Sequence, residues 1–316
     1  MPMNRPLITV VGSFVVGMTL RTQRMPIFGE TLIGSDFDMG PGGKGSNQAV
    51  AIARLGAQAA FAGIIGTDQL GEIATDLYAQ EGVDTTYLQR TGAASTGAGF
   101  IILNQAGENG IVIDMGANEG MDGAFVDQLE DQIARSDVVM SVLEIPVEAA
   151  TRAMALGRRH GVRTILNPAP ATHLDEAVLR NVDYLTPNET ELRILQGLPA
   201  DDPTPTLDLA RQMQAQGVRN LIVTQGEKGA LVLSESDTFE VAGIALSRDI
   251  VDTTGAGDAF NGGLAVALAE GKSLREAVRF ACCTGRLACD KIGVVPALAH
   301  REQAEQLHRT IYGQSQ

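Results

Sequence analysis

The chain has 316 residues, which at about 100–200 residues per domain corresponds to one large domain or one domain with a smaller addition. Apolar residues make up 44% and charged residues 20%, a composition that excludes a disordered, collagenous or coiled-coil protein. With 24 basic against 38 acidic residues the net charge is −14, so we expect neither nucleic acid nor an anionic membrane surface as a partner.

The longest apolar runs, such as Ala59 to Gly66, are too short to cross a bilayer as a helix, which takes about 20 residues. Leu7 to Leu20 resembles the core of a signal peptide, but glycines interrupt it, and it predicts a first buried strand that runs into a loop. Cys282, Cys283 and Cys289 have the spacing of neither a disulfide framework nor a Cys-x-x-Cys metal site. The sequence therefore predicts a cytoplasmic protein.

Short apolar runs alternate with segments of helical periodicity along most of the chain. The runs typical of strands are Ala59–Ile65, Val138–Ile145, Thr164–Leu166, Tyr184–Thr186, Leu221–Thr224 and Ala230–Leu233. The segments typical of helices are Ser46–Leu55, Gln69–Gln80, Val147–His160, Thr206–Gln216 and Ala256–Glu270. This alternation predicts an α/β fold, a three-layer α/β/α core with a mostly parallel sheet, whose ligands lie beyond the carboxyl ends of the strands.

Two stretches without a helical stripe interrupt this alternation, Val15 to Gly40 and Gly92 to Gly116. Within the second, Thr96–Leu103 and Gly110–Asp114 predict a hairpin around residues 105–108. The two stretches either pair into a small second sheet that forms a lid over a site, or are unrelated surface loops. We expect a core of residues 1–14, 41–92 and 117–316 and a β lid of residues 15–40 and 93–116.

The segment from Asp252 to Leu264 reads Asp-Thr-Thr-Gly-Ala-Gly-Asp-Ala-Phe-Asn-Gly-Gly-Leu. A Gly-Ala-Gly turn that leads into a helix leaves backbone N–H groups unpaired at the positive end of the helix dipole, which predicts an anion cradle. Asp258 follows this turn and could accept a proton from a hydroxyl that attacks a phosphorus atom held there. The alternative is an Asp that only caps the helix.

The segment from Gly40 to Ala49 reads Gly-Pro-Gly-Gly-Lys-Gly-Ser-Asn-Gln-Ala. It contains the letters of a dinucleotide-binding turn, but it does not directly follow the first strand, as that turn does. Gly45 also stands where a phosphate-binding loop has Ser or Thr after Gly-Lys. Such glycines allow close backbone approach, and Lys44 and Asn47 offer polar groups to a hydroxylated ligand. The alternative is a flexible turn before a helix.

Together the two segments resemble those of ribokinase-type sugar kinases of the phosphofructokinase B family. That family carries a Gly-Gly-x-Gly-x-Asn motif early and an Asp-Thr-x-Gly-Ala-Gly-Asp-x-Phe motif late. Residues 166–171, Leu-Asn-Pro-Ala-Pro-Ala, and 186–191, Thr-Pro-Asn-Glu-Thr-Glu, are also similar to these enzymes, as are 95–97 and 116–118. The resemblance covers nearly the whole chain. It implies a ribokinase-like fold and an ATP-dependent kinase that phosphorylates a primary hydroxyl of a sugar or sugar-like compound.

The resemblance also implies roles for single residues. Asp258 corresponds to the family's catalytic base, and the amides of Gly255, Ala256 and Gly257 to its anion hole. The implied nucleotide contacts are Asn188 and Glu191, the latter with Mg²⁺ through water, together with Thr224, Gly226, Gly255, Gly257 and Cys282. Cys282 lies in a helix expected from Leu274 to Lys291, beside the adenine. The implied sugar contacts are Gly17, Gly42, Gly43, Lys44, Asn47, Glu144 and Asp258.

Monovalent-cation binding is implied for the loop that contains Asp252 and Thr254, completed near Gly293, with K⁺ as an activator. A homodimer through the lid is expected as well, because a small exposed sheet has open edges. Arg286 departs from the small residues that the family has in this region, and it reaches either a neighbouring carboxylate or solvent.

One departure concerns the acceptor. The strand after Gly12 and Ser13 has Val15 where ribokinases have Asn and Gly17 where they have Asp, the two side chains that hold sugar hydroxyls. We therefore expect ribose to be a poor substrate. A nucleoside kinase of the same family and a non-catalytic sugar-binding regulator are the alternatives.

Overall fold

The computed structural model describes residues 5–104, 108–246 and 250–313. Of the hairpin turn predicted around residues 105–108, residues 105–107 lie outside them. In the described part of the chain, no helix is long and apolar enough to cross a membrane.

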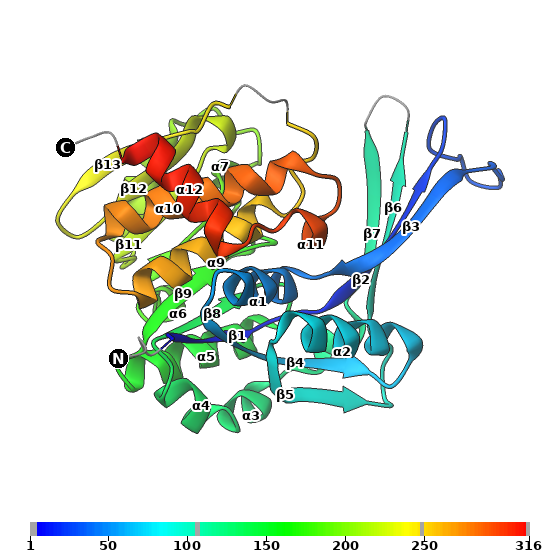
Figure 1. Ribbon diagram of the computed structural model, residues 1–316, viewed down its shortest axis with the longest axis horizontal. Helices are drawn as coiled ribbons and strands as arrows, with labels where there is room; N and C mark the ends of the chain where they lie inside the picture. The colour runs from blue at the N-terminus through cyan, green and yellow to red at the C-terminus, as the bar shows by residue number, and fades with distance from the viewer. Residues whose placement is uncertain (1–4, 105–107, 247–249, 314–316) are drawn as a thin grey trace.

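A nine-stranded sheet runs through the middle of the described structure, in the order β13-β12-β11-β10-β9-β8-β1-β4-β5 (Figure 1). Its strands are β1 Leu7–Val11, β4 Gln58–Gly66, β5 Asp84–Thr91, β8 Val138–Val142, β9 Arg163–Asn167, β10 Tyr184–Leu185, β11 Asn220–Thr224, β12 Gly229–Leu233 and β13 Thr238–Ala242. The pairs from β11 to β5 are parallel, and only β12 and β13 are antiparallel to their neighbours. The predicted α/β architecture is confirmed.

Helices cover both faces of this sheet. One layer contains α1 Lys44–Arg54, α2 Gln69–Glu81, α9 Ala256–Ala269, α10 Leu274–Leu287, α11 Val294–Ala297 and α12 Arg301–Tyr312. The other contains α3 Gly123–Asp127, α4 Glu130–Ala134, α5 Val147–Arg159, α6 Glu176–Leu179, α7 Glu189–Leu195 and α8 Thr206–Ala215. Short 3-10 turns are η1 Gly116–Gly120, η2 Gly226–Lys228 and η3 Ala288–Asp290.

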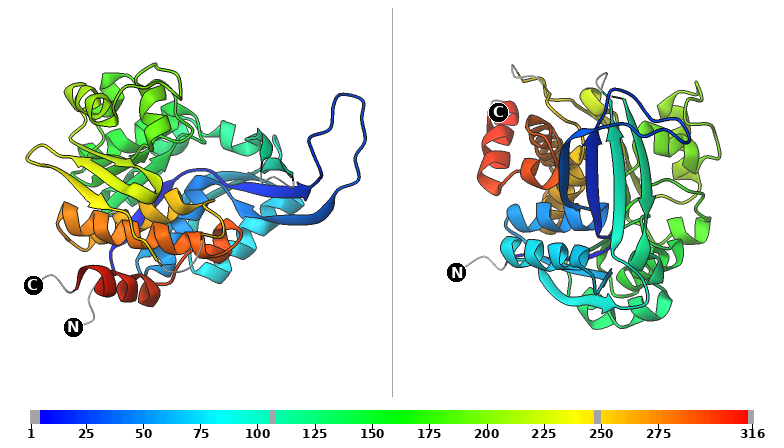
Figure 2. Two further views of the ribbon diagram at one scale, coloured as in Figure 1. Left: turned by 90° about the horizontal axis from the view of Figure 1, so that it is seen from above. Right: turned by 90° about the vertical axis from the view of Figure 1, so that its right-hand side faces the viewer.

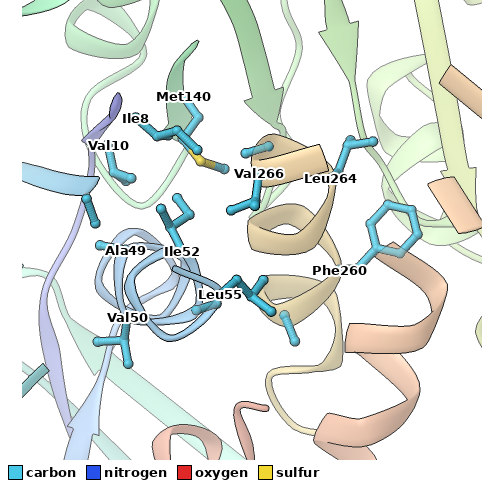
Figure 3. Packing of buried hydrophobic residues seen from close by; sticks show 14 of the residues in the cluster. Ile8, Val10, Ala49, Val50, Ile52, Leu55, Met140, Phe260, Leu264 and Val266 are labelled. Atoms are coloured by element: carbon cyan, nitrogen blue, oxygen red, sulfur yellow. The ribbon is translucent and has the colours of Figure 1, made fainter. Parts of the chain in front are cut away.

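Alternation along the strands divides the apolar core between the two layers. Ile8 and Val10 of β1 lie in the cluster that contains α1 and α9, whereas Val11 lies in the cluster on the opposite face. Figure 3 shows the first cluster, where Ile52 of α1 and Met140 of β8 pack beside the same strand. This packing fixes α1 and α9 next to each other at the carboxyl ends of the central strands.

The two predicted excursions pair into one smaller sheet, as the lid hypothesis requires. Its order is β3-β2-β6-β7, with β2 at Val15–Arg21, β3 at Ser35–Gly42, β6 at Gly97–Leu103 and β7 at Asn109–Asp114. The two excursions meet in the parallel pair of β2 and β6. This sheet projects from the main body at the right of Figure 1, and in the right-hand view of Figure 2 it lies in front of the body.

Two sequence-based boundaries were wrong. The strand expected at Val138–Ile145 ends at Val142, because the next residue, Leu143, turns its N–H to the carbonyl of Ala169. The helix expected from Leu274 to Lys291 ends at Leu287 and continues as η3. The carbonyl of Cys289 there accepts the N–H of Val251 instead of taking part in a helix.

Candidate active site

The glycine-rich turn after β3 is held tightly against the connection between β1 and β2. Gly43 has a φ of 87°, and a Cβ on it would lie 2.8 Å from the nitrogen of Val15. A Cβ on Gly45 would lie 2.6 Å from the nitrogen of Ser13. Only glycine fits at both positions, and the close approach fixes the start of α1 at Lys44.

Asp258 lies in the first turn of α9 and is 6% exposed. Its Oδ2 accepts a hydrogen bond from Asn47 Nδ2 at 2.8 Å, and its Oδ1 accepts one from Gln48 Nε2 at 3.1 Å. The N-cap of α9 is Gly255, and no side chain forms a capping hydrogen bond there. The carboxylate is presented between α1 and α9.

A chain of buried side chains, not expected from the sequence, supports this carboxylate. Gln48 Nε2 also donates to Asn167 Oδ1 at 3.1 Å, and Asn167 Nδ2 donates to the carbonyl of Thr186 at 3.2 Å. Thr186 Oγ1 donates to Asn261 Oδ1 at 2.7 Å, and Asn261 Nδ2 donates to the carbonyl of Gly257 at 2.9 Å. This series of hydrogen bonds thus starts at the Asp258 carboxylate and ends at the carbonyl of the preceding residue, Gly257. Asn167 and Thr186 belong to motifs of the family resemblance, which was the only signal for them.

Two buried oxygens next to Asp258, Asn47 Oδ1 and Gln48 Oε1, have no hydrogen-bond partner among the described residues. The nitrogen of each of these amides donates to Asp258. A buried acceptor without a partner costs free energy unless a ligand or water pairs with it. A ligand hydroxyl beside Asp258 would satisfy one of them.

Charge in the site is concentrated around Lys44. Burial by itself lowers the pKa of the Lys44 ammonium, but the carboxylates of Asp258, Glu144 and Glu191 outweigh this and leave the pKa above its ordinary value. Burial also raises the pKa of each of these three carboxyls, against the opposing effect of Lys44. The structure therefore brings these four sequence-predicted residues within electrostatic reach of one another.

Glu144 is held rigidly at the carboxyl end of β8. Its Oε2 accepts hydrogen bonds from the Ser13 hydroxyl at 2.6 Å and from the Lys44 backbone N–H at 2.7 Å. Both bonds use the same oxygen, which leaves Oε1 for a ligand. Ser13 was not singled out as a site residue, although it stands directly before the strand that carries Val15.

The glycine turn before α9 provides an N–H cluster at a helix N-terminus. Gly255 has a φ of 80°, and a Cβ on it would lie 2.4 Å from Val294 Cγ1, so glycine is required. The N–H of Ala256 donates to the carbonyl of Thr253 at 3.2 Å. The N–H groups of Gly255 and Gly257 have no acceptor among the described residues, and a Cβ on Gly257 would meet nothing within 4 Å. An anion has room there.

Asn188 and Glu191 form a capping box at the start of α7. Asn188 Oδ1 accepts the N–H of Glu191 at 2.7 Å, and Glu191 Oε2 accepts the N–H of Asn188 at 2.8 Å. The cap lies near the site, because the charges of Lys44 and Asp258 both affect the pKa of Glu191. Asn188 also bridges to Thr224 at the end of β11, where η2 begins at Gly226 with a φ of 56°.

The loop before the glycine turn brings Asp252, Thr254 and Gly293 together. Asp252 Oδ1 accepts hydrogen bonds from the Thr254 N–H at 2.9 Å and hydroxyl at 2.7 Å, and Oδ2 accepts the N–H of Gly293 at 3.2 Å. Burial alone would raise the pKa of Asp252, but these hydrogen bonds prevail and lower it, so the carboxylate is ionised. Nearby, Arg286 reaches a neighbouring carboxylate, Asp290, at 2.7 Å.

Cys282 lies in α10 and packs against the core cluster that contains α9. Burial raises the pKa of its thiol to about 12, so it is not a reactive thiolate at neutral pH. Cys289 lies in η3, after α10 has ended at Leu287, so the two thiols do not lie on one α-helix.

Side chains alone do not form a metal cage. No group of three or more His, Cys, Asp or Glu residues in the described structure could hold a metal ion. Glu191 offers a single carboxylate near Asp258, which fits Mg²⁺ held mainly by phosphate oxygens and water, with Glu191 in contact through water.

Comparison with known proteins gives a consistent result. The sequence model of the family described as pfkB family carbohydrate kinase matches residues 5–301. The chain is 37% identical over 299 residues to a protein named ribokinase from Haemophilus influenzae, a match that covers 95% of this chain and 97% of that protein. It is also 37% identical over 256 residues to a deoxyribokinase from Salmonella typhi, covering 81% and 83%.

Among solved structures, the chain is similar to a ribokinase from Arabidopsis thaliana complexed with ribose and ATP. The TM-score is 0.90 at 29% sequence identity, and the match covers 97% of this chain and 99% of that one. Likeness over almost the whole of both chains confirms the predicted fold.

Proposed function

Because this chain belongs to the pfkB family of carbohydrate kinases, which are phosphotransferases with an alcohol group as acceptor, we propose that it transfers the γ-phosphoryl group of ATP to a primary hydroxyl of a sugar-like compound. The observation that carries this proposal is the buried Asp258 carboxylate, held by two amide donors directly beside an N–H cluster at a helix N-terminus. An ADP-release assay over a panel of acceptors tests it.

The geometry suggests how the reaction proceeds. Asp258 takes the proton of the acceptor hydroxyl as the hydroxyl oxygen attacks the γ-phosphorus. The bond between the γ-phosphorus and the oxygen that bridges it to the β-phosphate breaks, and ADP leaves. The N–H groups of Gly255 and Gly257, with that of Ala256 when its bond to Thr253 opens, stabilise the charge that spreads over the transferring group. Lys44, Asn47 and Glu144 orient the acceptor next to the Gly42–Gly43 turn.

The nucleotide side of the site is proposed from its position along the carboxyl ends of β10 and β11. Asn188 and Glu191 face the phosphates, and Thr224 and Gly226 contact the nucleotide, with Cys282 on the helix beside the adenine. Mg²⁺ bound to the ATP phosphates would neutralise part of their charge.

The smaller sheet, residues 15–40 and 93–116, would close over the acceptor and exclude water. It also exposes large apolar side chains, including Phe37, Phe100 and Val112 at 62%, 55% and 73%. An exposed apolar patch of this kind indicates a contact surface, and we propose that two copies of the chain associate through their lids.

Activity should rise when K⁺ replaces a bulky organic cation. An ion bound by the ionised Asp252 would order the loop that leads into Gly255–Gly257, so the gain should appear in kcat rather than in KM. Steady-state rates in KCl and in tetramethylammonium chloride at equal ionic strength measure it.

Asp252→Asn is the matched variant, since it keeps an oxygen for Thr254 but removes the charge. It should lose most of the response to K⁺. Equal wild-type rates in both salts would remove the cation from the proposal.

Gln48→Leu should lower kcat about tenfold and move the acidic limb of the pH profile of kcat to higher pH. Asp258 must be ionised to act as a base, and one lost hydrogen-bond donor raises the pKa of a carboxyl that burial already raises. Measuring kcat between about pH 5 and pH 9 tests this, because a merely structural role would lower the rate without moving the limb.

Gln132→Leu is the control, because Gln132 is equally buried but donates to Thr9 away from the site. Its pH profile should match that of the wild type. An unshifted limb in Gln48→Leu would show that Gln48 does not position the base.

A nucleoside kinase is the second candidate within this family. Comparing adenosine with free sugars as acceptors in the same assay separates the two. A non-catalytic regulator would release no ADP with any acceptor, which the intact surroundings of Asp258 argue against.

A further inference from the structure

Three glycines lie side by side across the middle of the smaller sheet. Gly17 of β2 pairs with Gly40 of β3 on one side and with Gly99 of β6 on the other. Directly paired residues point to the same face of a sheet, so the three form one row across three strands, here called the glycine stripe. Glycine weakens the interior of a strand, so three in a row need a physical reason.

Neither backbone conformation nor packing within the described structure requires these glycines. None of the three has a positive φ. A Cβ on Gly40 would meet nothing within 4 Å, while on Gly17 the nearest atom would lie at 3.8 Å and on Gly99 at 3.6 Å. At Gly97, near the root of the same sheet, a Cβ would lie 2.7 Å from the Asn118 side chain. The space along the stripe is therefore open, and glycine in a strand often marks the close approach of a ligand.

The stripe lies on the face of the smaller sheet that does not pack on the core. Val16 belongs to the core cluster that includes Tyr78 of α2, whereas Val15, which points to the stripe's face, belongs to neither core cluster. Val15 pairs with Gly42, two residues before Lys44. The stripe thus begins beside the turn that presents the polar residues of the acceptor site.

The surroundings of the stripe are apolar. Val15 Cγ1 and Ile113 Cγ1 would lie 3.8 and 3.6 Å from a Cβ on Gly99, and Ile101 Cδ1 would lie 3.8 Å from one on Gly17. The floor is sheet backbone, and its middle strand, β2, is paired on both sides, with β3 and with β6. The next pair outward on the same face is Thr19 with Asp38. The stripe itself and its neighbours Val15, Ile101 and Ile113 offer no polar side chain to a hydroxyl.

We propose that the glycine stripe is a subsite for the end of the acceptor remote from the phosphorylated hydroxyl, and that it takes an apolar group. Three strands at about 4.8 Å spacing make a floor roughly 10 Å wide, enough for a small alkyl group or a ring. The acceptor class is then a sugar that is deoxygenated or alkylated at that end. This inference rests on the proposed function.

The test compares D-ribose, 2-deoxy-D-ribose and methyl β-D-ribofuranoside, which all keep the primary hydroxyl. The wild type should prefer the two less polar acceptors over ribose by about tenfold or more in kcat/KM, the usual size of discrimination in an apolar pocket. Gly17→Ala, Gly40→Ala and Gly99→Ala should each reduce that preference, chiefly through KM. Their Tm should not fall, because each new methyl group enters open space.

Gly120→Ala is the matched control, since Gly120 also lacks a positive φ and a Cβ there would lie 3.9 Å from Ile64 Cδ1. It should leave the preference unchanged. An unchanged preference in all three stripe variants, or a wild type that prefers ribose, would overturn the subsite. If no compound is phosphorylated, the kinase proposal fails, and thermal-shift binding of the same three compounds to the same variants still decides the subsite.

Discussion

Asp258→Asn is expected to reduce turnover at least about 10²-fold, the lower range for loss of a general base. The substitution keeps the size of the side chain but removes its charge and its capacity to take a proton, and it leaves one of the two amide donors, Asn47 or Gln48, without its acceptor oxygen. ATP binding should be largely retained, because the N–H groups of Gly255 and Gly257 belong to the backbone. Steady-state kcat from ADP release and calorimetric titration with a non-hydrolysable ATP analogue measure the two effects separately.

The pH dependence of the wild type follows from the same group. Burial raises the pKa of Asp258 above that of an ordinary carboxyl. As the pH decreases, kcat should therefore begin to fall at a higher pH than that at which exposed carboxyls titrate. Asp258→Asn should lack this acidic limb in its residual activity.

Asp183→Asn is the control, since this carboxylate is also hydrogen-bonded but lies far from the site. It accepts from the Thr164 N–H at the amino end of β9, whereas the site lies at the carboxyl ends of the strands. It should lower stability without a large loss of kcat. Near-normal turnover of Asp258→Asn would remove the base assignment.

D-Ribose is expected to be a poor acceptor, one to two orders of magnitude below the best acceptor in kcat/KM, because losing one charged hydrogen-bond partner typically costs about that much affinity. The structure places no polar side chain at Gly17, where the nearest atoms to a Cβ are Gly40 O and Ile101 Cδ1, both at 3.8 Å. Val15 beside it is equally apolar. The remaining polar groups, on Lys44, Asn47 and Glu144, can hold only one end of a sugar.

A variant that should gain activity with ribose tests the same interpretation of Gly17. Gly17→Asp should raise kcat/KM for ribose by about tenfold or more, because a carboxylate can accept from two sugar hydroxyls and the site has room for it. Gly17→Ala supplies bulk without acceptors and should not do so. Ribose as the best acceptor of the wild type, with kcat/KM of about 10⁴ M⁻¹s⁻¹ or above, would contradict our interpretation of Val15 and Gly17.

Local and repeated patterns predicted the fold class, and the family resemblance supplied most of the candidate site residues. The central strands are buried on both faces, so each is a continuous apolar run, and Val138 to Val142 is buried throughout. The edge strands β5 and β13 were missed because most of their residues are exposed or half-buried, so they carry no such run. The glycine turns at Gly43 and Gly255 were identifiable because a positive φ is a local demand that glycine meets best.

Contacts between distant segments were decided only by the tertiary structure. Gln48 and Asp258 are 210 residues apart, and nothing in either segment indicates that the amide meets the carboxylate until α1 and α9 pack together. The glycine stripe has the same origin, since Gly17, Gly40 and Gly99 become neighbours only through the register of β2 with β3 and β6. Register depends on pairing over long loops, and a shift by one residue would turn every side chain to the other face, so strand sequence alone does not specify the row.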